Sequence, residues 1–399
     1  MRKTLCFFGG YGPQYWLNIR TPDIEGKCDG ITVCSLDDEG KLIKLSDIHG
    51  IDSPATLAVS PGGKFLYAAN ELNNFKGLGH GGGISSFSFD EKSNKLKILN
   101  QVSGSCTAYI AIDKYGKYLF VANHGSYYYV SRYEIDDFGH VTPSVIRDEG
   151  CVCVYKIMND GSVGPLVDRL VLEGRGHDPI VHGVSHPHCV VIDENDDVII
   201  PDKGGDQIYY CHFSRDNEKL AVRSVFNSGD GSSPRHAVFI KGTPYIAVTN
   251  EFDAHLTIYR IDRANGCLVP TAKVDTYDPD IPQECDLVDT ARPWAIDVRI
   301  HPNGKFVYVD NTQNIICLFY LNEHGGIELI ENTPVENAGM VRGMGISPDG
   351  RYLIITGVSG EKADVFAINQ HSGHLSHVSS IELPTPTAVA FKVYGGRDD

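Results

Sequence analysis

The chain lacks several features that would place it in a specialised class of protein. None of its 399 residues belongs to a run of 18 apolar residues, and its start has no charged segment, apolar segment and cleavage site of a secretory signal. It also has no cluster of Lys and Arg, and its net charge is −16. Because nucleic acids and anionic lipids attract positive proteins, neither is an expected partner.

The cysteines also exclude a class of site. The eleven cysteines are odd in number and scattered, with no pair of C-x-x-C motifs, so a structural zinc site is not indicated. Cys34 and Cys317 lie in the apolar runs ITVCSL and IICLFY, where a free cysteine packs as a small hydrophobic residue. Together with the missing signal segment, this pattern leads us to expect a cytoplasmic protein.

Helical periodicity is absent from every stretch longer than ten residues, and a repeat takes its place. Each unit has two strands joined by a turn such as PGGK or PNGK, and then two further strands. The second half of the unit occurs at residues 30–45, 83–99, 151–166, 207–222, 255–270, 315–330 and 363–378. Seven copies predict an all-β, seven-bladed β-propeller in which residues 1–399 form one domain.

The first half of the unit has only six complete copies, and the seventh is divided between the chain ends. PTAVAFKV (386–393) would pair with TLCFFGGYG (4–12). Such a blade closes the ring and removes the free sheet edges.

Propeller geometry predicts where a site would lie. The innermost strand of each blade lines the central channel, so its start and the end of the second strand meet at one mouth of that channel. The inner strands start at SHPHC (185–189), SPRHA (233–237), ARPWA (291–295) and VRGMG (341–345). Three longer segments, which we interpret as irregular, enter the same face and span residues 71–83, 124–150 and 271–291.

Several side chains at these positions are candidates for binding or catalysis. Arg235 begins an inner strand, where a buried guanidinium group needs an anion or several carbonyls, and Arg342 occupies the equivalent place two blades further on. Pro187 separates His186 from His188, and we favour His188 as the residue that faces the channel. The other candidates are Glu251, His236, Arg292, Trp294 and Asn311.

A polar residue at the end of the second strand recurs from blade to blade. These residues are Asn70, Asn123, Asp202, Asn250 and Asn311. Because they recur, a structural role in capping the following turn is favoured over substrate binding, although Asn311 is kept as a binding candidate.

At these positions the sequence resembles the lactonase propeller family, which contains bacterial 6-phosphogluconolactonases and fungal carboxymuconate-lactonizing enzymes. The most specific segments are SHPHCVVID, SPRHAVFI with the following TNEFDAHLTIY, ARPWAIDVRIHPNGKFVYV and VRGMGISPDGRYL. The resemblance implies that His188, Arg235 and Glu251 are catalytic, with Arg342 and His186 as neighbours. The chain departs from the family at Asn311 and Thr312, where members often carry an arginine.

The leading hypothesis is hydrolysis of a sugar-derived lactone. Glu251 or His188 would act as general base on water, while Arg235 and Arg342 would hold an anionic substrate and stabilise the oxyanion. Because no G-x-S-x-G sequence is present, direct attack by water is favoured over an acyl-enzyme. No cofactor is expected, and the partner would be a small anionic or sugar-like molecule.

Two other functions fit the same residues. A cycloisomerase or lyase also needs a proton-transfer group and cationic clamps. A metal-assisted variant would use some of His80, His124, His186 and His188, because imidazole suits a divalent transition-metal ion. The third reading is a non-catalytic propeller that binds a small molecule. The strands show no long apolar run that would predict a protein partner.

Overall fold

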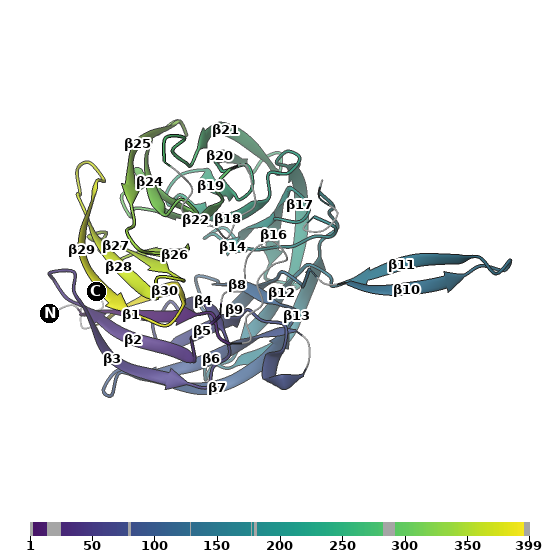
Figure 1. Ribbon diagram of the computed structural model, residues 1–399, viewed down its shortest axis with the longest axis horizontal. Helices are drawn as coiled ribbons and strands as arrows, with labels where there is room; N and C mark the ends of the chain where they lie inside the picture. Colours follow the sequence, from purple (N-terminus) through teal and green to yellow (C-terminus); the bar gives the residue numbers. More distant parts are fainter. Residues whose placement is uncertain are drawn as a thin grey trace.

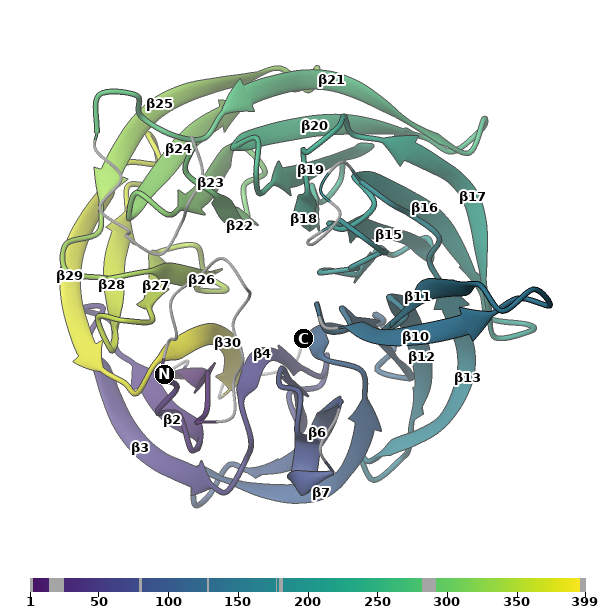
Figure 2. The same ribbon diagram turned by 45° about the vertical axis from the view of Figure 1, so that its right-hand side comes forward.

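The computed structural model describes residues 3–13, 25–78, 81–127, 129–176, 178, 182–281 and 292–394. Seven four-stranded antiparallel sheets surround a central channel, as Figure 1 and Figure 2 show. The prediction of a seven-bladed, all-β propeller is therefore confirmed. In the described ranges the one helical element is a short 3-10 turn, η1 (Phe75–Gly77), so no described helix could cross a membrane.

The ring is closed by a blade built from both ends of the chain. Its strands, from the channel outward, are β30 (Pro386–Tyr394), β1 (Lys3–Gly10), β2 (Gly30–Leu36) and β3 (Leu42–His49). In the register of β1 against β30, Cys6 lies opposite Phe391 and Phe8 opposite Val389. The predicted pairing of the chain ends is confirmed, and it gives this blade four strands like each of the other six.

The other six blades follow one another along the chain. The next two consist of β4 (Pro54–Val59), β5 (Phe65–Asn70), β6 (Gly82–Asp90) and β7 (Lys95–Gly104), and of β8 (Thr107–Ile112), β9 (Tyr118–Asn123), β12 (Cys151–Ile157) and β13 (Val163–Val171). The fourth consists of β14 (Val191–Ile192), β15 (Asp197–Asp202), β16 (Gln207–Ser214) and β17 (Lys219–Asn227). The fifth consists of β18 (Pro234–Phe239), β19 (Tyr245–Asn250), β20 (His255–Asp262) and β21 (Cys267–Asp275). The last two consist of β22 (Ala295–Ile300), β23 (Phe306–Asn311), β24 (Ile315–Leu321) and β25 (Ile327–Pro334), and of β26 (Val341–Ile346), β27 (Tyr352–Gly357), β28 (Lys362–Ile368) and β29 (Leu375–Glu382).

The core lies between neighbouring blades. Strand residues alternate between the two faces of a sheet, and each face packs on the next blade. Phe120 and Val154 of one blade, for example, share a cluster with Val198 and Phe213 of the next. All four are fully buried. This packing makes the ring a rigid support for side chains at the channel.

A β-bulge at the start of the inner strands positions the two arginines. In β18, Pro234 lies opposite Asn250 and His236 opposite Thr249, so Arg235 is an extra residue between them. The same shift in β26 leaves Arg342 between two paired residues. A bulge turns a side chain away from the regular alternation, and here both guanidinium groups reach the cavity at the channel mouth.

The long segments differ in part from the expectation that they are irregular. Within 124–150, β10 (Tyr129–Ile135) and β11 (Val141–Arg147) form a separate two-stranded hairpin that projects from the ring (Figure 1). Period-2 alternation in these strands was the signal that the interpretation missed. Residues 271–275 belong to β21, and residues 71–83 contain η1 and the start of β6.

Candidate active site

A small cavity, partly open to solvent, lies at the channel mouth. Its polar lining includes Tyr11, Glu71, His188, Arg235, His236 and Arg342. These residues come from five different blades, so the cavity exists only because the ring closes. The predicted site at one mouth of the channel thus contains a real concave surface.

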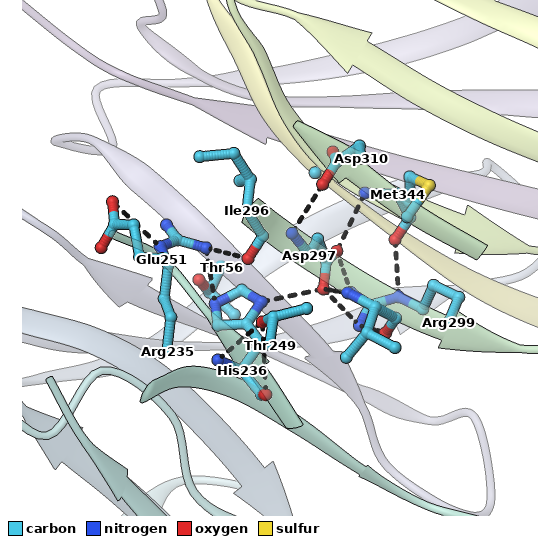
Figure 3. A network of polar contacts seen from close by, with 12 residues as sticks. Thr56, Arg235, His236, Thr249, Glu251, Ile296, Asp297, Arg299, Asp310 and Met344 are labelled. Carbon is cyan, nitrogen blue, oxygen red and sulfur yellow. Dashed lines mark hydrogen bonds and ion pairs between the residues drawn. The ribbon is translucent and has the colours of Figure 1, made fainter. Parts of the chain in front are cut away.

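A buried cluster of charges holds Arg235 in place. Its Nε lies 3.7 Å from Oε1 of Glu251, and its Nη1 donates a hydrogen bond of 2.6 Å to the carbonyl of Ile296 (Figure 3). Arg235 is 2% exposed and Glu251 1%. Because a buried guanidinium needs such partners, the residue is fixed and charged while still lining the cavity.

Lys203 is a second buried cation, which the sequence interpretation missed. Its Nζ forms an ion pair with Oε2 of Glu251, and it lies 5.2 Å from the ring centroid of Phe252 and 5.9 Å from that of Trp294. Burial lowers the pKa of Lys203, although Glu251 opposes this effect. The sequence signal was PDK, at the end of the second strand of its blade. In the next blade the same place is occupied by TNE, which contains Glu251.

The two glutamates of the site have opposite electrostatic environments. Burial opposes ionisation of Glu251, but Lys203, Arg235 and Arg342 outweigh it and lower the pKa of its carboxyl group. Glu71 is partly exposed, and burial raises its pKa despite the same cations, with Glu251 adding to the rise. Among the described residues, none forms an ion pair or hydrogen bond with the Glu71 carboxylate. Glu251 is therefore a fixed anion, whereas Glu71 is available for proton transfer.

Both ring nitrogens of His236 are held by neighbouring side chains. Arg235 Nη1 lies 3.1 Å from its Nε2, and since arginine can only donate, this nitrogen accepts. Its Nδ1 therefore carries the proton and donates to Oδ1 of Asp297 at 2.8 Å (Figure 3). Burial lowers the pKa of His236 to about 4, so the ring is neutral near pH 7.

Asp297 anchors this network from the next blade. Its Oδ2 accepts from the backbone N–H of Met344 at 3.0 Å and lies 2.8 Å from Nη2 of Arg299. Burial opposes its ionisation, yet Arg299 and His236 lower the pKa of Asp297 well below the usual range. Neighbouring Asp310 accepts from the Asp297 N–H at 2.6 Å, and burial beside that charge raises the pKa of Asp310 to about 7.

Arg342 reaches the cavity from the blade of β26, two blades on from Arg235. Its Nε donates to the hydroxyl of Tyr11 at 2.8 Å, which fixes the direction of the guanidinium group. A guanidinium group on a cavity wall suits a carboxylate, a phosphate or a developing oxyanion, and Arg342 lies on this wall. Tyr11 was not a sequence candidate, and it enters the site from the turn after β1.

Three of the proposed metal-binding histidines lie together, and two of their rings stack. The rings of His124 and His186 are 4.6 Å apart and inclined by 22°, and the His188 ring lies 5.5 Å from that of His124. Nδ1 of His186 lies 2.7 Å from the backbone carbonyl of His124. Within the described ranges no three His, Cys, Asp or Glu side chains are placed to hold one ion. His80 lies outside the described residues.

His188 is the one of these three that lines the cavity. Burial, followed by the charge of Arg235, lowers its pKa well below the usual value, so it is neutral. Its Nδ1 has no hydrogen-bond partner among the described residues. His186 is also buried, and its pKa falls to about 4 for the same reason, but it is not part of the cavity wall. Of the two histidines that Pro187 separates, His188 thus lines the cavity and His186 does not.

The structure corrects the assignment of Asn311 to substrate binding. This residue is fully buried; its Nδ2 donates to the carbonyl of Thr276, and its Oδ1 accepts from the N–H of Gln313 at 2.8 Å. Since both amide atoms are used within the chain, Asn311 caps a turn. Asn70 and Asn123 are also bonded within the chain, since Asn70 Nδ2 donates to the carbonyl of Asp52 and Asn123 Oδ1 accepts from the N–H of Ser105 at 3.1 Å.

Two further candidates lie outside the cavity wall. Arg292 is exposed, donates to the carbonyl of Asp253 at 3.3 Å and lies over the ring of Tyr277. Trp294 is 2% exposed and packs with Phe252, so it supports Lys203 from behind. Neither residue is among those that line the cavity.

Comparison with known proteins agrees with this architecture. Residues 18–391 match the family model described as "Lactonase, 7-bladed beta-propeller". A 6-phosphogluconolactonase of Formosa agariphila is 27% identical over 345 residues, 84% of this chain and 87% of that protein. One from Pectobacterium atrosepticum is 25% identical over 350 residues, 86% of this chain and 90% of that protein.

A solved structure of similar shape is the periplasmic gluconolactonase of Pseudomonas aeruginosa. It is 22% identical, with a TM-score of 0.79, and the match covers 98% of this chain and 99% of that one. A putative 6-phosphogluconolactonase from Bacteroides fragilis has a TM-score of 0.76 at 21% identity and covers 98% of both chains. These structures support the fold, and the family model covers most of the chain. The chain belongs to the seven-bladed β-propeller lactonase family.

Proposed function

We propose that this protein hydrolyses a sugar-derived lactone in the cavity at the channel mouth. The observation that carries the proposal is the meeting of Glu71, His188, Arg235 and Arg342 on one cavity wall. A proton-transfer group, a neutral imidazole and two cations are what addition of water to an ester carbonyl needs. The relatives named as 6-phosphogluconolactonases and a gluconolactonase support this substrate class.

In the proposed reaction, water attacks the carbonyl carbon of the lactone. Glu71 removes one proton from this water while the new C–O bond forms, and the negative charge develops on the carbonyl oxygen. Arg235 and Arg342 lie on the cavity wall as donors for that oxygen. The bond from the carbonyl carbon to the ring oxygen then breaks, and Glu71 returns its proton to the ring oxygen, which becomes a hydroxyl group.

Glu71 fits the general-base role better than Glu251. Glu251 is fixed by Lys203 and Arg235, and its lowered pKa makes it a weaker base. The pKa of Glu71 is raised by burial, which brings it toward the working pH, and its carboxylate faces the cavity. Glu251 would instead hold the two cations in position. His188 would donate or accept a hydrogen bond to the water or to a substrate hydroxyl.

Titration of released acid at constant pH tests the proposal. The substrates would be 6-phosphogluconolactone, glucono-δ-lactone and a carboxylated lactone of the muconate type. We expect enzyme-dependent release of one proton per lactone opened for at least one sugar lactone. A shift in melting temperature without turnover would favour a binding protein, and ring closure of an open carboxylated acid without net water addition would favour a cycloisomerase.

A further inference from the structure

The β10–β11 hairpin presents one apolar face to solvent. In its register Tyr133 lies opposite Pro143, Ile135 opposite Val141, and Ser131 opposite Val145. Because side chains alternate along a strand, these residues share one side of the hairpin. We call the surface made by Tyr133, Ile135, Val141 and Val145 the apolar face of the hairpin.

The opposite side of the hairpin is mostly polar. It carries Arg132 opposite Ser144 and Glu134 opposite Thr142, with one apolar pair, Val130 and Ile146. No long apolar run is visible in the sequence, because the apolar residues alternate with polar ones. This alternation explains why the sequence predicted no partner surface.

An uncovered apolar face is unusual for this kind of element. A lone two-stranded hairpin is only marginally stable in water unless its hydrophobic side is packed. Here Tyr133 and Ile135 are each 71% exposed, Val141 57% and Val145 51%. The hairpin pairs with no other described strand and projects from the ring (Figure 1). The apolar face is therefore expected to be covered by another molecule.

We propose that the apolar face packs against the same face of a second copy of this chain, forming a two-fold dimer. An aromatic side chain such as Tyr133 buries ~150–250 Å², and with the three aliphatic side chains beside it, each more than half exposed, the face presents on the order of 500 Å² of apolar surface. A stable interface buries ~800 Å² per partner. The apolar face would supply most of that area, with the flanking polar atoms as its rim.

Charge also favours a second copy over a lipid surface. The whole chain carries −16, which opposes approach to anionic membranes. Residues 129–147 contain two arginines and three carboxylates and are nearly neutral. Strands of seven residues reach ~23 Å, which is about three Debye lengths at physiological salt. Two hairpins can therefore meet while the acidic rings stay far enough apart for salt to screen their repulsion.

Light scattering coupled to size-exclusion chromatography tests the dimer with the full chain. At ~10 µM the wild type should have twice the mass of one 43.7 kDa chain. The double variant Tyr133→Ser/Ile135→Ser should be monomeric, with dimer affinity at least about 100-fold weaker. The matched control is Val130→Ser/Ile146→Ser, which removes a similar apolar pair from the other face and should remain dimeric.

Three results would overturn the proposal. The first is a wild-type monomer at ~100 µM, and the second is equal loss of the dimer in both double variants. The third is sedimentation of the wild type with phosphatidylcholine or phosphatidylserine vesicles that depends on Tyr133 and Ile135, because it would assign the face to lipid. Unchanged melting temperature of the variants shows that the ring is folded, so the result does not depend on whether the protein is a lactonase.

Discussion

Replacing each site glutamate by glutamine separates the general base from the structural anion. Glu71→Gln should lower kcat by about 10²–10⁴-fold, or about 3–5 kcal/mol of barrier, because the amide takes up no proton from water. Its melting temperature should be unchanged or higher. Burial raises the pKa of Glu71, so the folded state disfavours the charged form that glutamine replaces.

Glu251→Gln should behave in the opposite way toward stability. It leaves Lys203 and Arg235 in a buried site without their anion, which costs about 3–5 kcal/mol. For 399 residues with about 2.1 cal/mol/K of unfolding entropy each, this loss lowers the melting temperature by about 4–6 °C. Activity would also fall, because the two cations lose their fixed positions.

The two variants are compared by differential scanning calorimetry and by acid release from glucono-δ-lactone. The pH dependence adds a second readout. The stability that Glu251 contributes is present above the pKa of glutamate in the unfolded chain, and it is lost as the pH falls through the lowered pKa of Glu251 in the folded protein. Glu71 acts in the opposite direction, because its ionisation costs stability as the pH rises through its raised pKa. If Glu71→Gln keeps more than half of wild-type kcat, or melts several degrees lower than Glu251→Gln, the assignment of roles is refuted.

Three further substitutions have distinct expected effects. Arg342→Ala should lower kcat by about 10²–10³-fold, since it removes an oxyanion donor. Arg342→Lys should recover little activity, because lysine cannot reproduce the planar guanidinium group, and the rate of hydrolysis of a sugar lactone checks both variants. Asn311→Ala should lower the melting temperature by about 1–4 °C through lost buried hydrogen bonds and leave kcat unchanged, and an activity loss with normal melting would return Asn311 to substrate binding. Arg292→Ala should change kcat/KM less than about twofold, because the side chain is exposed and outside the cavity wall; a larger drop in a steady-state assay would place it in the site.

The sequence predicted the fold because its signals are local and repeated. Turns such as PGGK and PNGK, followed by alternating strands, occur often enough to count the blades, and the split seventh blade follows from closure. The bulges that place Arg235 and Arg342 in the cavity could not be predicted in this way. They depend on the register between two strands, which sequence alternation alone does not give.

The place of the site was also predictable, whereas the roles of its residues were not. Strand ends gave the channel mouth, but the difference between Glu71 and Glu251 comes from contacts between blades. Lys203 neutralises Glu251 across a blade boundary, and no spacing in the sequence reveals that pair. Asn311 shows the converse, because this capping residue stands at a strand end, where other blades carry candidate site residues.

Turnover of glucono-δ-lactone in ¹⁸O-labelled water tests the central claim most directly. Direct attack of water on the carbonyl carbon predicts enzyme-accelerated formation of an acid with one labelled oxygen in its carboxylate and none in the hydroxyl derived from the ring oxygen. The mass spectrum of the product distinguishes these positions after fragmentation. Label in that hydroxyl group, or product formation no faster than without the protein, would contradict the account.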